Sequence, residues 1–230
     1  MLIPSRNCPL CPRLTEFRGV QRTAHPEWFN APVPSFGGPD AQLLIVGLAP
    51  GLRGANRTGR PFTGDYAGGL LYNMLRKFGF ADGVYEAHIG DGLALHRARI
   101  TNAVRCVPPE NKPKPIEIAA CRRFLAAEIE GLPKLRVILA LGAVAHQTVI
   151  ATLGLRRRLF PFAHGVVHEL PDGKLLADSY HCSRYNTNTG RLTVAMFEAI
   201  IAALVGRLDL LGEDGRSTSL GASGGKTDLV

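Results

Sequence analysis

The sequence lacks an apolar run long enough to cross a membrane, and its first residues lack the apolar block of a secretory signal. The longest apolar run covers residues 137–145, whereas a membrane span needs roughly 18 such residues. The opening MLIPSRNCPLC has no apolar core of the kind that export signals carry. These absences argue against a membrane partner and predict a cytoplasmic protein.

Lysine and acidic residues are few beside arginine. Of 27 basic residues, 21 are Arg and six are Lys, and 19 acidic residues leave a net charge of +8. The planar guanidinium group binds phosphate through paired hydrogen bonds, so this excess favours a nucleic-acid partner. An arginine-rich genome would produce the same count, and charge alone does not separate the two explanations.

The composition also argues against disorder over most of the chain, because 46% hydrophobic and 20% charged residues are typical of globular proteins. Residues 1–211 are expected to form one domain, and the Gly/Ser-rich residues 212–230 a flexible tail. Residues 1–40 show little periodicity and predict an extended segment that lies on the core.

Apolar runs alternate with helical patterns along the rest of the chain. The expected strands cover residues 42–48, 99–104 and 136–141, followed by a hairpin over 160–177. The expected helices cover residues 66–78, 115–132, 143–152 and 192–211. This alternation predicts an α/β fold with a mostly parallel sheet between helices.

Three loops follow the predicted strands, and they cover residues 48–65, 105–114 and 178–191. Parallel sheets bind their ligands at the carboxyl ends of the strands, which is where these loops begin. We therefore expect the functional residues to lie in these three loops.

Five cysteines are too many by one for a fully paired disulfide framework, and a cytoplasmic location favours metal binding instead. Cys8 and Cys11 form a CxxC pair, and Cys106 and Cys121 flank a proline-rich loop. Four thiolates suit a tetrahedral zinc ion or an iron–sulfur cluster, and ligand type alone does not choose between them. Isolated buried thiols are the simpler alternative. Cys182 adjoins His181, but neighbours in an extended segment point apart, which disfavours a nucleophilic pair.

The first loop combines backbone freedom with cations, one aromatic residue and one acid. Its glycines, Gly51 among them, let backbone N–H groups approach an anion closely. Phe62 is suited to stacking on a base. Asp65 directly precedes a helix, so an N-cap is the simpler interpretation of that carboxylate. The cations suited to phosphate are Arg53, Arg57 and Arg60.

The second and third loops supply polar groups for a base. Asn102 is a lone amide in an apolar strand, and it suits the edge of a pyrimidine or serves as a buried structural amide. His181 suits hydrogen-bond donation to developing negative charge. The candidate phosphate contacts are Ser183, Thr189 and Arg191, with Thr189 also a candidate cap of the last helix. Arg184 and Tyr185 are placed at the loop tip, where a wedge could enter a duplex.

Three segments at these loops read GLAPGLRGANRTGRPFTGD, ITNAVRCVPPENKP and HCSRYNTNTGRLT. They resemble the three motifs of the iron–sulfur uracil-DNA glycosylases, most closely family 5, the B-type enzymes. The resemblance includes the four cysteines and covers about residues 5–205. It implies a three-layer α/β/α sandwich with a central, mostly parallel four-stranded sheet. It also implies a monomer that excises uracil from DNA, with other deaminated bases as further candidate substrates.

The resemblance also implies residue roles. Phe62 stacks on the extruded uracil, Asn102 binds its polar edge, and His181 donates to uracil O2. Asp65 orients water or supports the cationic sugar. Gly47 and Ala49 complete the base site. The four cysteines, Cys8, Cys11, Cys106 and Cys121, carry a structural [4Fe–4S] cluster, with zinc as the lesser alternative.

Two features depart from the family pattern. Family 5 has His-Pro-Ser-Pro at the third motif, and here Cys182 and Arg184 replace both prolines, so the loop loses two fixed φ angles. Leu48 stands where family 4 carries Glu, which places more weight on Asp65. The alternative function is a non-catalytic nucleic-acid-binding module with a structural four-cysteine metal site.

Overall fold

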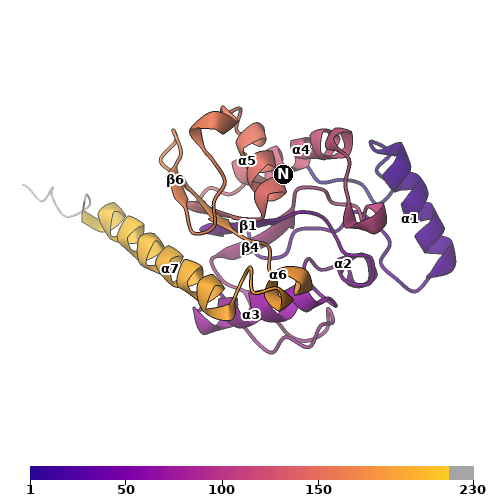
Figure 1. Cartoon of the computed structure of the whole chain (residues 1–230), viewed down its shortest axis with the longest axis horizontal. Helices are drawn as coiled ribbons and strands as arrows, with labels where there is room; N and C mark the ends of the chain where they lie inside the picture. Colours follow the sequence, from indigo (N-terminus) through magenta and orange to yellow (C-terminus); the bar gives the residue numbers. More distant parts are fainter. Residues whose placement is uncertain (218–230) are drawn as a thin grey trace, which may run out of the picture.

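The computed structural model describes the backbone of residues 1–217 and the side chains of residues 1–210. Its centre is a sheet in the order β4-β1-β5-β7-β6 (Figure 1). The four parallel strands are β4 (Ala98–Asn102), β1 (Leu43–Gly47), β5 (Val137–Leu141) and β7 (Leu175–Ser179). Strand β6 (Val167–Glu169) pairs antiparallel with β7 at one edge.

The sheet therefore has five strands, one more than the four that the sequence predicts. The four parallel strands are as expected, and the fifth is β6, the first arm of the predicted hairpin, which pairs antiparallel with the second arm, β7. Every residue of β1 and β5 is buried, which explains their continuous apolar sequences.

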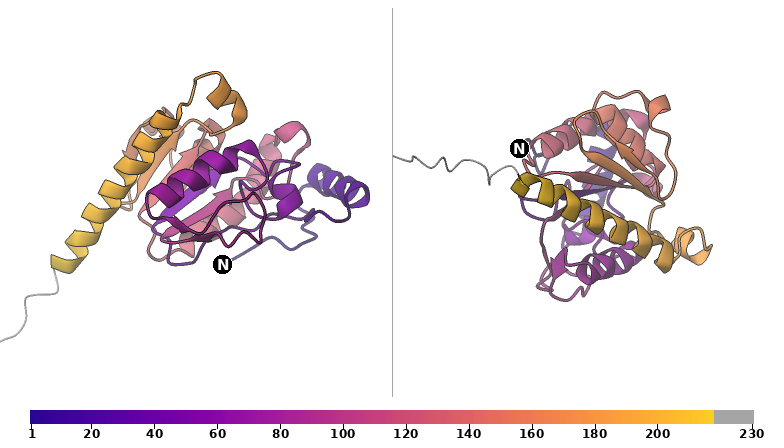
Figure 2. Two further views of the ribbon diagram at one scale, coloured as in Figure 1. Left: turned by 90° about the horizontal axis from the view of Figure 1, so that it is seen from below. Right: turned by 90° about the vertical axis from the view of Figure 1, so that its left-hand side faces the viewer.

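Helices cover both faces of the sheet and give three layers (Figure 2). Leu43 and Ile45 point to the face covered by α3 (Tyr66–Lys77) and α7 (Val194–Ser217). The alternate residues of β1 point to the other face, where their apolar contacts include α4 (Pro115–Glu130) and α5 (Ala143–Thr152). The period of two along each strand thus divides its side chains between two cores.

Short elements lie in the connecting segments between the main helices and strands. A two-stranded ribbon pairs β2 (Ala81–Asp82) with β3 (Ala94–Leu95). The remaining short elements are α2 (Ala55–Thr58), η1 (Pro109–Asn111), η2 (Arg157–Leu159) and α6 (Arg184–Asn188). Helices α2 and α6 lie inside segments that the sequence predicts to be loops.

The N-terminal segment contains a helix, α1 (Pro12–Ala24), where the sequence predicts extended chain. Its buried residues are Leu14, Arg18 and Gln21, so polar side chains fill two of the positions that usually reveal a helix by their hydrophobicity. Pro12 is placed in the first turn, where a missing N–H costs nothing.

Helix α7 runs to Ser217, beyond the predicted end at residue 211. Gly212 and Gly215 lie within it, because glycine weakens a helix without ending it as proline does. The rest of the predicted tail, residues 218–230, lies outside the described residues. None of the described helices combines the length and apolar character that crossing a membrane requires.

Candidate active site and four-cysteine pocket

The loops that follow β1, β4 and β7 meet around one pocket of about 690 Å³. It opens at the carboxyl ends of the parallel strands, as the topology predicts. The predicted residues that line it are Ala49, Gly51, Arg53, Phe62, Asp65, Asn102, His181, Ser183 and Arg184. Tyr66 and Asn111 also line it, although the sequence did not single them out.

Gly47 does not itself line the pocket, but it shapes the pocket floor because it pairs in register with Asn102, which does. A Cβ atom at Gly47 would clash with Asn102 Oδ1 and would lie 2.7 Å from Phe62 Cζ. The absence of a side chain therefore lets the amide and the aromatic ring approach each other. Asn102 is only 4% exposed, so its amide faces the pocket from a nearly dry position.

Phe62 forms one wall of the pocket in a strained conformation. Its φ of 52° lies in the left-handed region, which an aromatic residue rarely adopts. Tyr85 Oη donates to the Phe62 carbonyl at 3.1 Å and helps to hold that backbone. Strain of this kind persists only where the surroundings fix it, and it is frequent at functional sites.

His181 leaves the end of β7 and stacks against Phe62, with ring centroids 5.8 Å apart and planes 26° apart. Burial lowers the pKa of His181 to about 4. The imidazole is therefore neutral near pH 7, with one ring N–H to donate. Asn186 Nδ2 donates to the His181 carbonyl at 2.8 Å and ties this residue to α6.

Asp65 is the N-cap of α3, as the simpler interpretation of the sequence holds, and it also lines the pocket. Its Oδ1 accepts from the Gly68 N–H at 3.3 Å. A Cβ atom at Gly54 would lie 2.6 Å from Asp65 Oδ2, so that glycine gives the carboxylate its space. Solvent reaches Asp65 through the pocket, yet desolvation by the surrounding protein raises the pKa of its carboxyl.

Arg60 does not lie at the surface, and the prediction that it contacts DNA phosphate is corrected here. Its guanidinium donates to both carboxylate oxygens of Asp91, at 2.8 and 2.6 Å. It lies 5.1 Å from the Phe36 ring centroid and 5.5 Å from that of Tyr72. With 5% of the residue exposed, Arg60 is a buried structural cation.

The other predicted DNA-contacting side chains lie near solvent. Arg53, Arg57, Arg184, Tyr185, Thr189 and Arg191 are exposed, and Ser183 is half-buried. The Arg184 guanidinium lies 5.3 Å from the ring centroid of Tyr66, at the pocket mouth. That of Arg191 lies 4.6 Å from the ring centroid of Tyr180.

Ser183 and Thr193 cap helices, whereas Thr189, the expected cap of the last helix, does not. Ser183 is the N-cap of α6 and accepts from the Asn186 N–H at 3.4 Å. Thr189 ends α6 and donates to the Tyr185 carbonyl, so it does not cap α7. Thr193 Oγ1 accepts from the Met196 N–H at the beginning of α7 instead.

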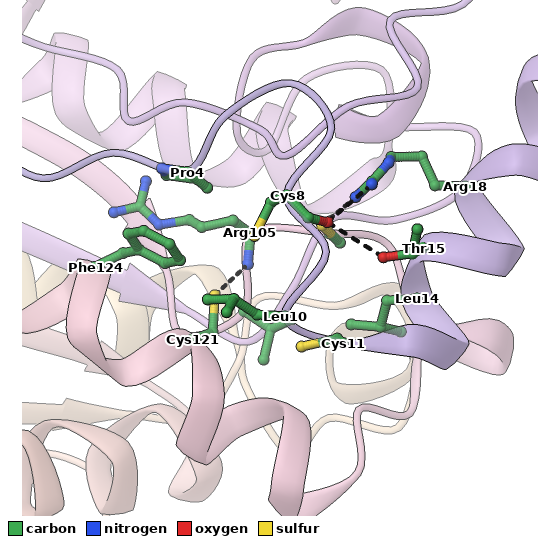
Figure 3. A pocket seen from close by; sticks show the side chains of 12 residues that line it. Pro4, Cys8, Leu10, Cys11, Leu14, Thr15, Arg18, Arg105, Cys121 and Phe124 are labelled. Atoms are coloured by element: carbon green, nitrogen blue, oxygen red, sulfur yellow. Dashed lines mark hydrogen bonds between the residues drawn. The ribbon is translucent and has the colours of Figure 1, made fainter.

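The four cysteines of the predicted metal set line a second pocket (Figure 3). Cys8 and Cys11 lie directly before α1, Cys106 follows β4, and Cys121 lies on α4. Segments far apart in the sequence thus bring four thiols to one place. Cys182 is separate, because it is fully buried in the main core and its Sγ lies 3.6 Å from the Ala67 carbonyl oxygen.

Hydrogen-bond donors lie beside two of these thiols, and they partly offset the cost that burial places on a charged sulfur. Arg18 is 2% exposed, and its guanidinium donates to Cys106 Sγ at 3.2 Å. The backbone N–H of Arg105 donates to Cys121 Sγ at 3.3 Å. Burial raises the pKa of Cys121 to about 12, so without a metal this thiol stays protonated near pH 7. The donor set therefore fits a metal centre that binds thiolates.

Comparisons with known proteins agree with this geometry. The family model described as the uracil DNA glycosylase superfamily matches residues 34–205. A type-5 uracil-DNA glycosylase of Thermus thermophilus is 48% identical over 200 residues, which cover 84% of this chain and 90% of that protein. A type-5 enzyme of Mycobacterium tuberculosis is 43% identical, over 84% of this chain and 75% of its own length. A type-4 uracil-DNA glycosylase of Thermotoga maritima is 41% identical over 46% of this chain and 47% of its own.

Proposed function

The chain belongs to the uracil-DNA glycosylase superfamily and acts as a uracil-DNA glycosylase, and from that premise we propose which residues perform the excision. Phe62, Asn102 and His181 bind the extruded uracil, and Asp65 acts at the sugar. The convergence of these four side chains on one pocket, from two separate loops and the end of β4, is the observation that carries this proposal.

The target base must leave the duplex before it can enter this pocket, at a cost of a few kcal/mol. The exposed Arg184 and Tyr185 stand beside the pocket at the start of α6, where they can fill the vacated stack. The remaining proposed backbone contacts are Gly51, Arg53, Arg57, Ser183, Thr189 and Arg191. Their hydrogen bonds and positive charge would hold the flanking phosphates and offset the cost of extrusion.

The Phe62 ring then stacks on the uracil face, an interaction worth about 1–3 kcal/mol per base. Asn102 carries both an amide donor and a carbonyl acceptor for the polar edge of the base. Gly47 and Ala49 leave space for the ring beside them. The nearly dry position of Asn102 makes an unmatched base costly, because a buried amide would lose its partners.

Cleavage breaks the bond between the sugar C1′ and uracil N1, and the electron pair leaves with the base. Negative charge then spreads to uracil O2, where the N–H of neutral His181 donates a hydrogen bond. Positive charge develops on the sugar, and the Asp65 carboxylate stabilises it. Water adds its oxygen to C1′, and Asp65 accepts the proton that this water loses. Uracil N1 takes up a proton from solvent and Asp65 releases its proton to solvent, so the products are an abasic site and free uracil.

For the four-cysteine pocket we propose a structural [4Fe–4S] cluster bound by Cys8, Cys11, Cys106 and Cys121. A tetrahedral zinc ion would hold its thiolates about 3.8 Å apart, given Zn–S bonds of about 2.3 Å. Within the described residues, no three of these cysteines bring their sulfur atoms within 4.8 Å of one another. That wider spacing favours a larger group over a single ion. Such a cluster would cross-link the N-terminal segment to the loop after β4 and to α4. Its role would be structural, because the excision itself moves no electrons.

An alkaline strand-cleavage assay on DNA with a single uracil tests the proposed residues. We expect the protein to act as a monomer. The Asn102→Ala and Asp65→Asn variants should bind this DNA and leave it largely intact after alkali. Parallel substrates with hypoxanthine or xanthine define the base range of the wild-type protein. If both variants cleave as the wild type does, the proposed assignment is wrong. A gel shift without cleavage by the wild-type protein would instead support a non-catalytic binding module.

A further inference from the structure

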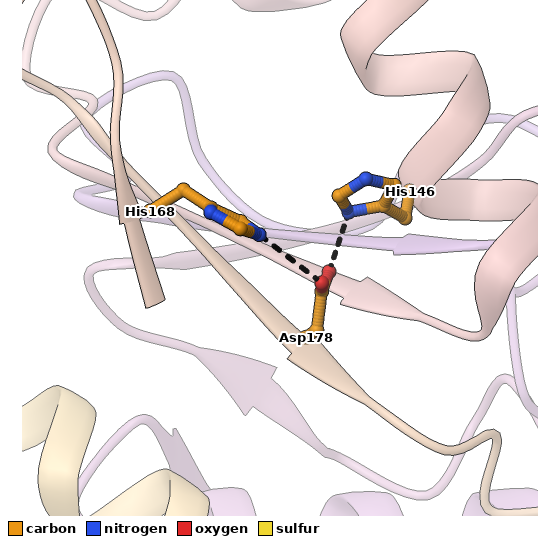
Figure 4. A group of neighbouring side chains, drawn as sticks. All are labelled: His146, His168 and Asp178. Atoms are coloured by element: carbon orange, nitrogen blue, oxygen red, sulfur yellow. Dashed lines mark hydrogen bonds and ion pairs between the residues drawn. The ribbon is translucent and has the colours of Figure 1, made fainter. Parts of the chain in front are cut away.

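Three side chains that the excision does not use meet on the far side of β7 from α3 (Figure 4). His146 comes from α5, His168 from β6 and Asp178 from β7. One ligand atom from each lies within 4.8 Å of the other two. The cluster is largely dry, because Asp178 is fully buried and His146 is 2% exposed.

The Asp178 carboxylate is only half satisfied. Its Oδ1 lies 2.7 Å from His146 Nδ1, at hydrogen-bond distance. Its Oδ2 is buried and has no hydrogen-bond partner among the residues that the structure describes. His168 Nε2 lies 3.7 Å from Oδ2, which is too far for a hydrogen bond. A buried carboxylate oxygen without a donor is costly, which indicates that a further group belongs beside it.

The outer contact of His146 suits metal binding. His146 Nε2 lies 2.8 Å from the Phe160 carbonyl oxygen, so this nitrogen carries a hydrogen and donates. That contact leaves Nδ1 directed at Asp178. Histidines that bind metals usually donate their other ring N–H to a carbonyl or carboxylate in this way. His168 Nε2 lies 3.0 Å from the Pro161 carbonyl oxygen, so this nitrogen donates there in the metal-free protein, and its hydrogen must move to Nδ1 before Nε2 can bind a metal.

We propose that His146, His168 and Asp178 bind one divalent transition-metal ion, with Zn²⁺ the best match to two imidazoles and a carboxylate. In a tetrahedral zinc site the nitrogen and oxygen ligands stand about 3.3 Å apart. The 3.7 Å between His168 Nε2 and Asp178 Oδ2 is close to that spacing. His146 Nδ1 faces the other oxygen, Oδ1, at 2.7 Å, and this contact must open by about 0.6 Å as the shared proton leaves to solvent.

The ion would brace the sheet rather than take part in excision. The ion would join α5, β6 and β7. Its ligand Asp178 lies three residues before His181, the proposed donor to uracil. The His168 side chain is 12% exposed, which gives the ion a route from solvent. Three protein ligands leave a fourth position for water.

Zinc titration of the iron-loaded wild-type protein tests the site. Calorimetry should show one Zn²⁺ bound per chain, with the iron content unchanged. X-ray absorption at the zinc edge should show only nitrogen and oxygen neighbours. Zinc at a hundredfold excess over its Kd should raise the Tm by about 5–10 °C. Sulfur neighbours would place the zinc at the four cysteines and overturn the proposal, as would the absence of stoichiometric binding.

His168→Asn is the informative variant, because His168 is the most accessible of the three ligands. It should bind zinc about 100-fold more weakly or worse, while uracil excision in the absence of zinc stays at the wild-type rate. His96→Asn is the matched control, since His96 forms an exposed ion pair with Asp82 at 2.6 Å. Equal zinc binding by both variants would refute the site. The absorption spectrum of the wild-type protein decides the matter if His168→Asn does not fold.

Discussion

His181 is the residue on which the proposed chemistry depends most directly. Removing one preorganised donor to a developing anion costs about 10²–10³ in rate. We therefore expect His181→Ala to lower single-turnover excision of uracil by about 10²-fold or more, with DNA binding retained. His96→Ala, an exposed histidine paired with Asp82, is the control and should excise normally. Near-wild-type excision by His181→Ala would remove His181 from the mechanism.

The lowered pKa of His181 also makes stability depend on pH. Between about pH 4 and 6.5 the unfolded chain binds this proton and the folded chain does not, so the free energy of unfolding rises with pH. The contribution is complete above pH 6.5 and is lost as the pH falls toward 4, by at most about 1.4 kcal/mol per pH unit.

Urea titrations of the wild type and His181→Asn at several pH values isolate this contribution. The difference in unfolding free energy between the two proteins should increase from pH 4 to 6.5 and then stay constant. A difference that does not change with pH would show that His181 titrates normally in the folded protein.

Gly47 tests how closely the floor of the pocket is packed. A methyl group there would collide with the Asn102 amide and the Phe62 ring. We expect Gly47→Ala to lose about 1–3 kcal/mol of stability and about 10²-fold in excision rate, because the base-binding groups must move apart. Gly69→Ala is the control, since a Cβ atom at Gly69 has nothing within 4 Å. If Gly47→Ala excises at the wild-type rate, the floor is not part of the site.

At the scale of elements, the loop around Arg60 shows the limit of charge as a sequence signal. Arg53 and Arg60 look alike in the sequence, but Arg60 is paired in the interior with Asp91, whose side chain is inaccessible. The partner lies 31 residues away, in a segment without recognisable periodicity. Sequence spacing therefore gave no means to tell a structural arginine from a phosphate-binding one.

Breaking the Arg60–Asp91 pair should destabilise the protein without acting on DNA directly. Loss of one member of a buried ion pair costs about 3–5 kcal/mol, so Asp91→Asn should lower the Tm by about 10 °C. Lys77→Met removes an exposed pair with Glu198 and should change stability by less than about 1 kcal/mol. A normal Tm for Asp91→Asn, measured by calorimetry, would show that the pair is not structural.

The elements that could be predicted are those with a hydrophobic pattern in the sequence, and the others depend on polar residues with distant partners. Strands β1 and β5 are buried on both faces, so their apolar sequences identify them directly. The buried face of helix α1 includes Arg18 and Gln21. The sequence of this helix, which lies beside the cysteines, therefore shows no hydrophobic pattern. The candidate loops could be located from residue types, but the contribution of Tyr66 and Asn111 to the pocket depends on tertiary contacts.

At the scale of the whole molecule, the cysteine pocket joins the N-terminal segment to the central layers. Cys8 and Cys11 line one pocket with Cys106 and Cys121, although about 100 residues of chain separate the two pairs. We expect the purified protein to be brown and to contain four irons per chain. Removing the iron with a chelator should lower the Tm and expose α1 to proteases first, because Leu14 and Arg18 pack around the thiols. A colourless protein with one zinc per chain would refute the cluster.

Both cores share the sheet, and residues 1–211 remain our predicted single domain.

The parallel register that sets Gly47 opposite Asn102 also has a consequence for correct folding. If β4 slipped by one residue, Asn102 would face the opposite side of the sheet, and Thr101 or Ala103 would take its level. Such a molecule would remain compact, but its pocket would have no amide to recognise a base. The fraction of catalytically competent enzyme in a preparation therefore reports how faithfully two neighbouring strands found their alignment.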